Sequence, residues 1–118
     1  MKKTKIGIIG NGFVGEAQAF AFSPVAQIYL FDIDPLKTQN SLHEVHDCEF
    51  VFVCVPTPMN IDGSQDLSIV ENVFKDANIN PIYILKSTVL PGTIDFLSSN
   101  FPDLKIVFSP EFLTERTA

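Results

Sequence analysis

The chain has 118 residues, of which 46% are hydrophobic and 19% are charged, and its formal net charge at pH 7 is -6. This length makes one domain that buries roughly two-thirds of its unfolded surface, and the composition is globular rather than disordered. No apolar run reaches the ~18 residues that a membrane span needs, and the negative charge argues against nucleic acid or an anionic membrane as the main partner.

The first predicted elements are a strand over residues 5–9 and a helix over 13–22, joined by a glycine turn. Its glycines fit G-x-G-x-x-G: the first allows a tight turn, the second lets a pyrophosphate approach the backbone, and the third lets the helix pack closely. The helix N-terminus then offers free N–H groups to phosphates. We therefore predict a dinucleotide-binding turn made of Gly10, Asn11, Gly12, Phe13, Val14 and Gly15.

A second strand over 27–31 ends at Asp32, which lies 17 residues past Gly15 and supplies the acid that this motif requires. Ser41 and Glu44 then form the S-x-x-E pattern of a capping box, which predicts a short helix over 42–47. Residues 49–55 are an almost continuous apolar, β-branched and aromatic run. This pattern is typical of a central parallel strand buried on both faces.

A loop over 56–66 separates this strand from a helix whose apolar residues recur at helical spacing from Leu67 to Ala77. Asp66 or Ser68 is the expected cap, and Ser68 with Glu71 forms a second capping-box pattern. A strand over 82–85 follows, then a helix that has Pro91 in its first turn and runs to about residue 100. The last predicted strand covers 105–108.

Strands that alternate with helices predict a Rossmann-like, doubly wound parallel sheet of about five strands in a three-layer α/β/α arrangement. Residues 1–118 then form a single domain. Ligands of such sheets bind beyond the carboxyl ends of the strands. The segments expected to share this rim are 10–15, 32–34, 56–59, 86–88 and 109–114.

Four signatures occur at this rim in sequence order. They are the glycine turn with Asp32, Val55-Pro56-Thr57-Pro58, Lys86-Ser87-Thr88-Val89 with Gly92-Thr93, and Pro110-Glu111-Phe112-Leu113 with Glu115. Many dehydrogenases share the first, but the other three together are much more specific. In this combination the chain resembles the N-terminal NAD-binding domain of the UDP-glucose/GDP-mannose dehydrogenases.

The resemblance implies oxidation of the C6 alcohol of a nucleotide sugar to a carboxylate, with NAD as the cofactor. It implies that Asp32 binds the adenosine ribose, where an acid disfavours the 2′-phosphate of NADP. Lys37 matches a position near the same ribose, although it is equally well explained as a solvated surface lysine. Further cofactor contacts are implied for Val55, Pro56, Thr57, Ser87, Thr88 and Glu115.

The resemblance also implies the catalytic residues. Thr88 matches a threonine that relays a proton through water, for which a hydroxyl is suited because it both donates and accepts; the alternative is a helix cap beside Pro91. Glu111 matches a general base that activates water, a role that needs a raised pKa; the alternative is a surface acid. Glu111, Phe112 and Leu113 match the segment that contacts the nucleotide sugar.

The chain departs from the family in its cysteines, at residue 116 and in the length of the stretch from Asp32 to Thr57. Neither Cys48 nor Cys54 matches the family's nucleophilic cysteine, which lies in a region beyond residue 118, and Cys54 is expected to be a buried, inert strand residue. No cysteine has metal-ligand spacing. Arg116 stands where the family usually has glycine.

The stretch from Asp32 to Thr57 is also far shorter than in the family, so one strand and its helix are missing at the edge that flanks the adenine. The predicted strand order is therefore 2-1-3-4-5, and we expect weakened NAD binding. Low-micromolar NAD affinity of the isolated chain would contradict this expectation.

Three interpretations of function remain open: part of a nucleotide-sugar dehydrogenase that is incomplete as a catalyst, a standalone dinucleotide-binding module, and a degenerate structural domain. The intact rim residues argue against the last. Hydroxyisobutyrate and phosphogluconate dehydrogenases share the glycine turn but lack V-P-T-P. We expect a UDP- or GDP-linked sugar as partner when a C-terminal domain is supplied, and no nucleic acid or membrane. The fifth-strand edge and the open rim are able to pair with another chain, a second copy included, and the expected setting is reducing and cytoplasmic.

Overall fold

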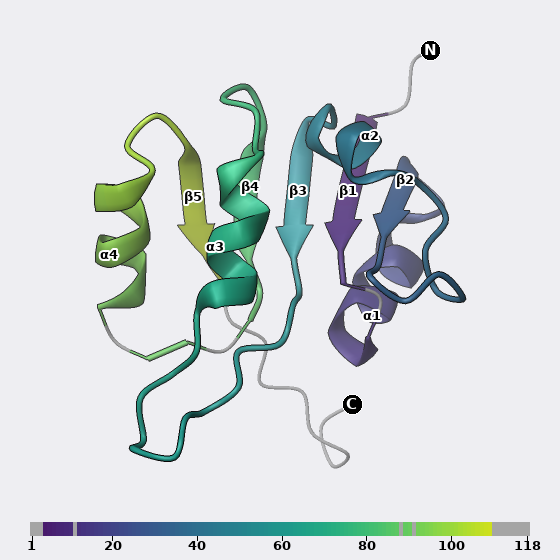
Figure 1. Cartoon of the computed structure of the whole chain (residues 1–118). Helices are drawn as coiled ribbons and strands as arrows, with labels where there is room; N and C mark the ends of the chain where they lie inside the picture. The colour runs from purple at the N-terminus through teal and green to yellow at the C-terminus, as the bar shows by residue number, and fades with distance from the viewer. Residues whose placement is uncertain (1–3, 11, 88, 91, 110–118) are drawn as a thin grey trace.

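A computed structural model describes residues 4–10, 12–87, 89–90 and 92–109. Within them, five strands form one parallel sheet in the order β2-β1-β3-β4-β5 (Figure 1). The strands are β1 (Thr4–Ile9), β2 (Ala26–Phe31), β3 (Phe50–Val53), β4 (Ile82–Leu85) and β5 (Lys105–Phe108). The predicted strand order is confirmed.

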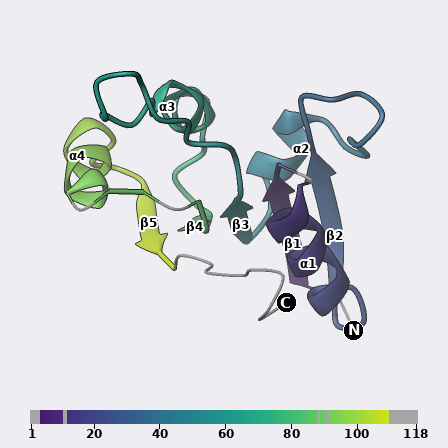
Figure 2. The same ribbon diagram turned by 90° about the horizontal axis from the view of Figure 1, so that it is seen from below.

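Within the same described ranges, four helices pack on the two faces of the sheet. They are α1 (Phe13–Phe22), α2 (Leu42–His46), α3 (Ser68–Lys75) and α4 (Thr93–Asn100). Figure 2 looks onto the carboxyl edge of the sheet and shows α2, α3 and α4 on one side. α1 packs on the opposite face, so the predicted three-layer arrangement is confirmed.

Each face of the sheet has its own apolar core. The core beneath α2, α3 and α4 includes Val45, Val51, Phe74, Tyr83 and Leu97, all nearly or fully buried. The core beneath α1 is smaller, and in it the rings of Phe22 and Phe52 stack with centroids 5.4 Å apart. Because β3 contributes to both cores, it is the central strand that its apolar run predicts.

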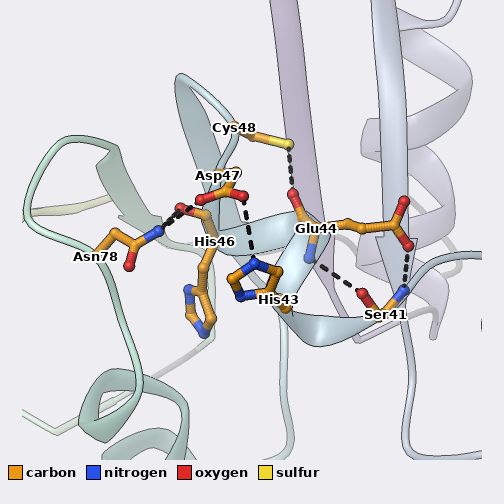
Figure 3. A network of polar contacts seen from close by, with 7 residues as sticks. All are labelled: Ser41, His43, Glu44, His46, Asp47, Cys48 and Asn78. Atoms are coloured by element: carbon orange, nitrogen blue, oxygen red, sulfur yellow. Dashed lines mark hydrogen bonds and ion pairs between the residues drawn. The ribbon is translucent and has the colours of Figure 1, made fainter.

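α2 packs directly against the backbone of β1 because Gly7 has no side chain. A Cβ at Gly7 would lie 2.7 Å from Val45 Cγ1, so a larger residue would push α2 off the sheet. The predicted capping box begins this helix: Ser41 Oγ accepts the Glu44 N–H at 3.2 Å, and Glu44 Oε1 accepts the Ser41 N–H at 2.9 Å (Figure 3).

The connection that contains α2 also covers the free edge of β2. The backbone N–H groups of Gln39 and Asn40 donate to the Leu30 carbonyl, and the Leu30 N–H donates to Asn40 Oδ1 at 2.9 Å. This loop segment thus pairs the edge N–H and carbonyl groups of Leu30, which a further strand would otherwise pair.

Some predicted local details are wrong. No capping box forms between Ser68 and Glu71; instead the Asp66 carboxylate accepts the Ser68 N–H at 2.9 Å. α4 begins at Thr93 after Gly92, whose φ of 89° favours glycine, and Pro91 lies outside the described residues. Cys54 follows the end of β3 and is half-buried, whereas Cys48 is buried.

A buried polar pair joins α2 to β4. His46 is 3% exposed, and its Nδ1 lies 2.9 Å from the Tyr83 hydroxyl, which also accepts the Asn78 N–H at 3.1 Å. The other ring nitrogen, Nε2, is buried and has no partner among the described residues. The Asn78 amide further donates to the His46 carbonyl and to Asp47 (Figure 3).

Burial governs the ionisation of this pair. It lowers the pKa of His46, an effect that His43 reinforces and that the carboxylates of Asp76 and Asp47 oppose. Burial also raises the pKa of Tyr83 to about 12. At neutral pH both groups are therefore uncharged, as a buried hydrogen-bonded pair requires.

We expect the free energy of unfolding to fall as the pH drops below about 6.5, the ordinary histidine pKa. Because the folded-state pKa of His46 is lowered, the unfolded state binds this proton first, and stability is lost as the pH falls toward the lowered value. Urea midpoints between pH 7.5 and 5 measure this loss. His46→Gln should flatten the profile, whereas the control His43→Gln, at an exposed residue, should keep it. A flat wild-type profile would contradict the assignment.

Candidate cofactor site

Two glycines of the turn are required by the fold itself. Gly10 has a φ of 98°, and a Cβ there would lie 2.6 Å from the Cys54 carbonyl oxygen. A Cβ at Gly15 would overlap the Gly10 carbonyl oxygen, because α1 crosses directly over the end of β1. The tight turn and the close helix–strand packing that the motif predicts are both confirmed.

Gly12 is required by neither conformation nor packing. Its φ of -85° and ψ of -159° are extended values that any residue adopts, and a Cβ built there meets no described atom within 4 Å. The space that a side chain would fill adjoins the N-terminus of α1, where backbone N–H groups attract anions. The absence of a side chain at Gly12 therefore leaves open space next to these N–H groups, and a pyrophosphate fits there.

A pocket of about 400 Å³ opens beside the turn at the carboxyl ends of β1, β2 and β3. Predicted cofactor-binding residues line one side of it: Gly10, Asp32, Val55 and Pro56. The Asp32 carboxylate is fixed there because its Oδ1 accepts the Asp34 N–H at 2.8 Å. The Asp32 N–H in turn donates to Thr38 Oγ1 at 3.0 Å, so the backbone at this position is held as well.

The opposite wall comes from residues that the sequence motifs do not assign. Leu42 of α2 lies there with Ile69, Asn72 and Val73 of α3 and with Asp76, the residue that directly follows α3. Their spacing of three and four residues places them on one face of a helix. That spacing is visible in the sequence, but it identifies a wall only once α3 is known to lie over this part of the sheet.

Side-chain hydrogen bonds join the ends of the neighbouring strands. The buried Ser87 hydroxyl donates to the Val55 carbonyl at 2.7 Å, and Lys86 Nζ donates to Ser109 Oγ at 3.4 Å. Since the Ser87 hydroxyl is used within the protein, the structure gives this residue a task in holding the rim. Its predicted contact with the cofactor stays a prediction.

The structure describes only some of the remaining predicted site residues. Thr57 is half-buried on the rim, and Lys37 is exposed in the turn after β2. Phe13 and Val14 begin α1, where only their backbone is described. The residues that lie outside the described part of the chain are Asn11, Thr88, Glu111, Phe112, Leu113 and Glu115.

Cys48 is not an activated nucleophile. Burial raises its pKa to about 11, and Sγ donates to the Glu44 carbonyl at 3.6 Å (Figure 3). The nucleophilic form of cysteine is the thiolate, which is scarce at neutral pH when the pKa is so high. The structure thus agrees with the expectation that Cys48 plays no covalent role.

Residues 34–118 match the family model described as UDP-glucose/GDP-mannose dehydrogenase family, NAD binding domain. The chain belongs to this family. It forms the NAD-binding domain, with NAD as cofactor, and the Gly10–Gly15 turn and Asp32 precede the matched segment. No helix in the described ranges is long and apolar enough to cross a membrane.

Curated relatives extend the match to nearly the whole chain. UDP-glucose 6-dehydrogenase of Campylobacter jejuni is 32% identical and that of Streptococcus pneumoniae 26% identical, each over 97% of this chain. The chain spans only 38% and 37% of their lengths. The Campylobacter alignment runs over 149 positions, more than the length of this chain, so the relative has residues that this chain lacks.

Solved structures confirm the fold. A UDP-glucose dehydrogenase from Pyrobaculum islandicum superposes with a TM-score of 0.78 at 22% identity, over 98% of this chain and 38% of that one. A GDP-mannose dehydrogenase from Pseudomonas aeruginosa gives 0.77 at 22% identity, over 96% and 37%. A 3-hydroxyisobutyrate dehydrogenase from Mycobacterium tuberculosis gives 0.68 at 16% identity, over 92% and 40%.

We expect Gly12→Val to fold normally but to lose NAD binding, because its side chain meets no described protein atom and fills the space left for the pyrophosphate. Gly15→Val should instead lose about 3 kcal/mol or more of stability through overlap with the Gly10 carbonyl. Thermal unfolding and calorimetric titration with NAD distinguish the two. NAD binding by Gly12→Val at wild-type affinity would show that the turn is not the phosphate site.

Proposed function

We propose that the chain is the cofactor-binding part of a nucleotide-sugar 6-dehydrogenase, which oxidises the C6 alcohol of a UDP- or GDP-linked sugar to a carboxylate with NAD. Family membership supports the reaction class, and the names of the relatives point to UDP-sugars. The observation that carries the cofactor assignment is Gly12, a glycine that the fold does not need, beside a pocket lined by Asp32.

In this proposal, the chain's own residues divide the work of holding NAD. The glycine turn and the N-terminus of α1 hold the pyrophosphate, and the fixed Asp32 carboxylate accepts hydrogen bonds from the adenosine ribose. The apolar pocket side chains, including Val55, Ile69 and Val73, sandwich the adenine. NAD itself supplies the hydride acceptor. Thr88 and Glu111 remain the proposed proton-relay and general-base residues.

We also propose that these residues alone do not complete the reaction. A thiohemiacetal route needs a cysteine thiolate, but neither Cys48 nor Cys54 matches the family's nucleophile, and burial raises the pKa of Cys48 to about 11. The alternative is a binding or sensing module without turnover. We further propose a cytoplasmic location, which the two free cysteines support, and NAD affinity weaker than low micromolar, since Leu42 and a short loop replace a strand and its helix. Pairing of β5 with a second copy remains a prediction.

The chain mixed with NAD and UDP-glucose, GDP-mannose or UDP-N-acetylglucosamine should bind NAD in calorimetry but form no NADH at 340 nm in a spectrophotometric assay. NADH formation by the chain alone would contradict its proposed incompleteness. Absence of NAD binding at millimolar concentration would contradict the proposed cofactor role.

A fusion to the C-terminal part of the Campylobacter jejuni enzyme separates the two interpretations. NADH formation from UDP-glucose by the fusion supports the dehydrogenase, provided that its Gly12→Val variant is inactive. A folded fusion that binds NAD without turnover favours the binding module.

A further inference from the structure

The side chain of Gln65 bridges two loops of the rim. Its Nε2 donates to the Thr57 carbonyl at 3.4 Å, and its Oε1 accepts the Leu90 N–H at 3.0 Å. A carbonyl only accepts and an N–H only donates, so the partners fix the orientation of this amide. Among side chains of this length, only an amide serves both loops at once.

Gln65 itself sits at the end of a loop that is closed by its own backbone. The Asp66 N–H donates to the Pro58 carbonyl at 2.7 Å, the Asn60 N–H donates to the Ser64 carbonyl at 2.7 Å, and Met59 pairs with Gln65 in an isolated antiparallel bridge. The loop that carries Thr57 is therefore a compact body. Through Gln65 it is tied to the segment that follows β4.

The Gln65 bridge lies on the side of the rim where the nicotinamide half of NAD is expected. The pyrophosphate is assigned to the end of β1 and the adenosine to Asp32 at the end of β2. The second half of NAD then extends the other way, over the ends of β3 and β4, since dinucleotides cross the sheet at the strand-order reversal. Thr57 and Leu90 follow β3 and β4 respectively.

We propose that Gln65 is a positioning residue for the nicotinamide half of NAD, which sets the separation between the Thr57 loop and the Leu90 segment. The inference rests on the proposed mode of NAD binding. The hydrogen bond from Ser87 to the Val55 carbonyl already joins the two chain segments directly after β4 and β3. Gln65 joins the same two segments farther along the chain from the strand ends. Because Gln65 is only half-buried and lies in a loop, its replacement leaves both apolar cores intact.

Gln65→Met tests the proposal because methionine has a similar length and makes neither hydrogen bond. We expect it to weaken NAD binding roughly threefold to tenfold in calorimetry, and to leave ADP binding unchanged, since ADP lacks the nicotinamide half. The matched control is Gln27→Met on an exposed residue near the start of β2, at the opposite edge of the sheet. It should bind both ligands as the wild type does.

Gln65→Glu separates the two bonds, since a carboxylate still accepts from Leu90 but cannot donate to Thr57. In ¹H–¹⁵N spectra the Leu90 amide resonance should move upfield in Gln65→Met and stay downfield in Gln65→Glu. Unchanged NAD binding by Gln65→Met, or equal weakening of NAD and ADP, would overturn the positioning role while the wild type still binds NAD. A wild type that binds no NAD would instead overturn the proposed function and the inference with it.

Discussion

The close contact between α1 and the end of β1 is the constraint on which the site depends. Gly15 lies against the Gly10 carbonyl, and Gly10 in turn leaves no room for a side chain beneath the Cys54 carbonyl. Backbone atoms just after β1, just after β3 and in the first turn of α1 thus meet without intervening side chains. This packing fixes the direction of the α1 N-terminus and leaves Gly12 on the open side, where an anion can reach the backbone N–H groups.

Close packing at a glycine also allows the short connection between β2 and β3 to complete the pocket. Gly7 lets α2 lie directly on β1, the Ser41–Glu44 capping box starts the helix, and the His46–Tyr83 pair fastens its end to β4. The position of α2 places Leu42, its first residue, in the wall of the pocket. The buried histidine is therefore part of what supports one wall of the proposed adenine site.

The sequence was informative where a residue type has one physical use. The glycine spacing, the capping box and the unbroken apolar run of β3 predicted the turn, the start of α2 and the central strand. It failed where tertiary contacts decide: helical spacing in α3 says which residues share a face but not what that face meets. Gly92, with its left-handed backbone, sets the start of α4 where proline was expected. Gln65 belongs to no sequence pattern, because its two hydrogen bonds form only when the loops after β3 and β4 fold next to each other.

In the proposed binding mode, the glycine turn and the Asp32 pocket hold NAD. Chemical-shift mapping of ¹⁵N-labelled protein during an NAD titration tests this binding mode residue by residue. We expect large, saturable shifts at the amides of Gly10, Gly12, Asp32 and Ile33, which surround the turn and the pocket. Saturable shifts confined to the small pocket between α4 and β5, around Ile94, Asp95 and Phe108, with Gly12 and Asp32 unmoved, would contradict it.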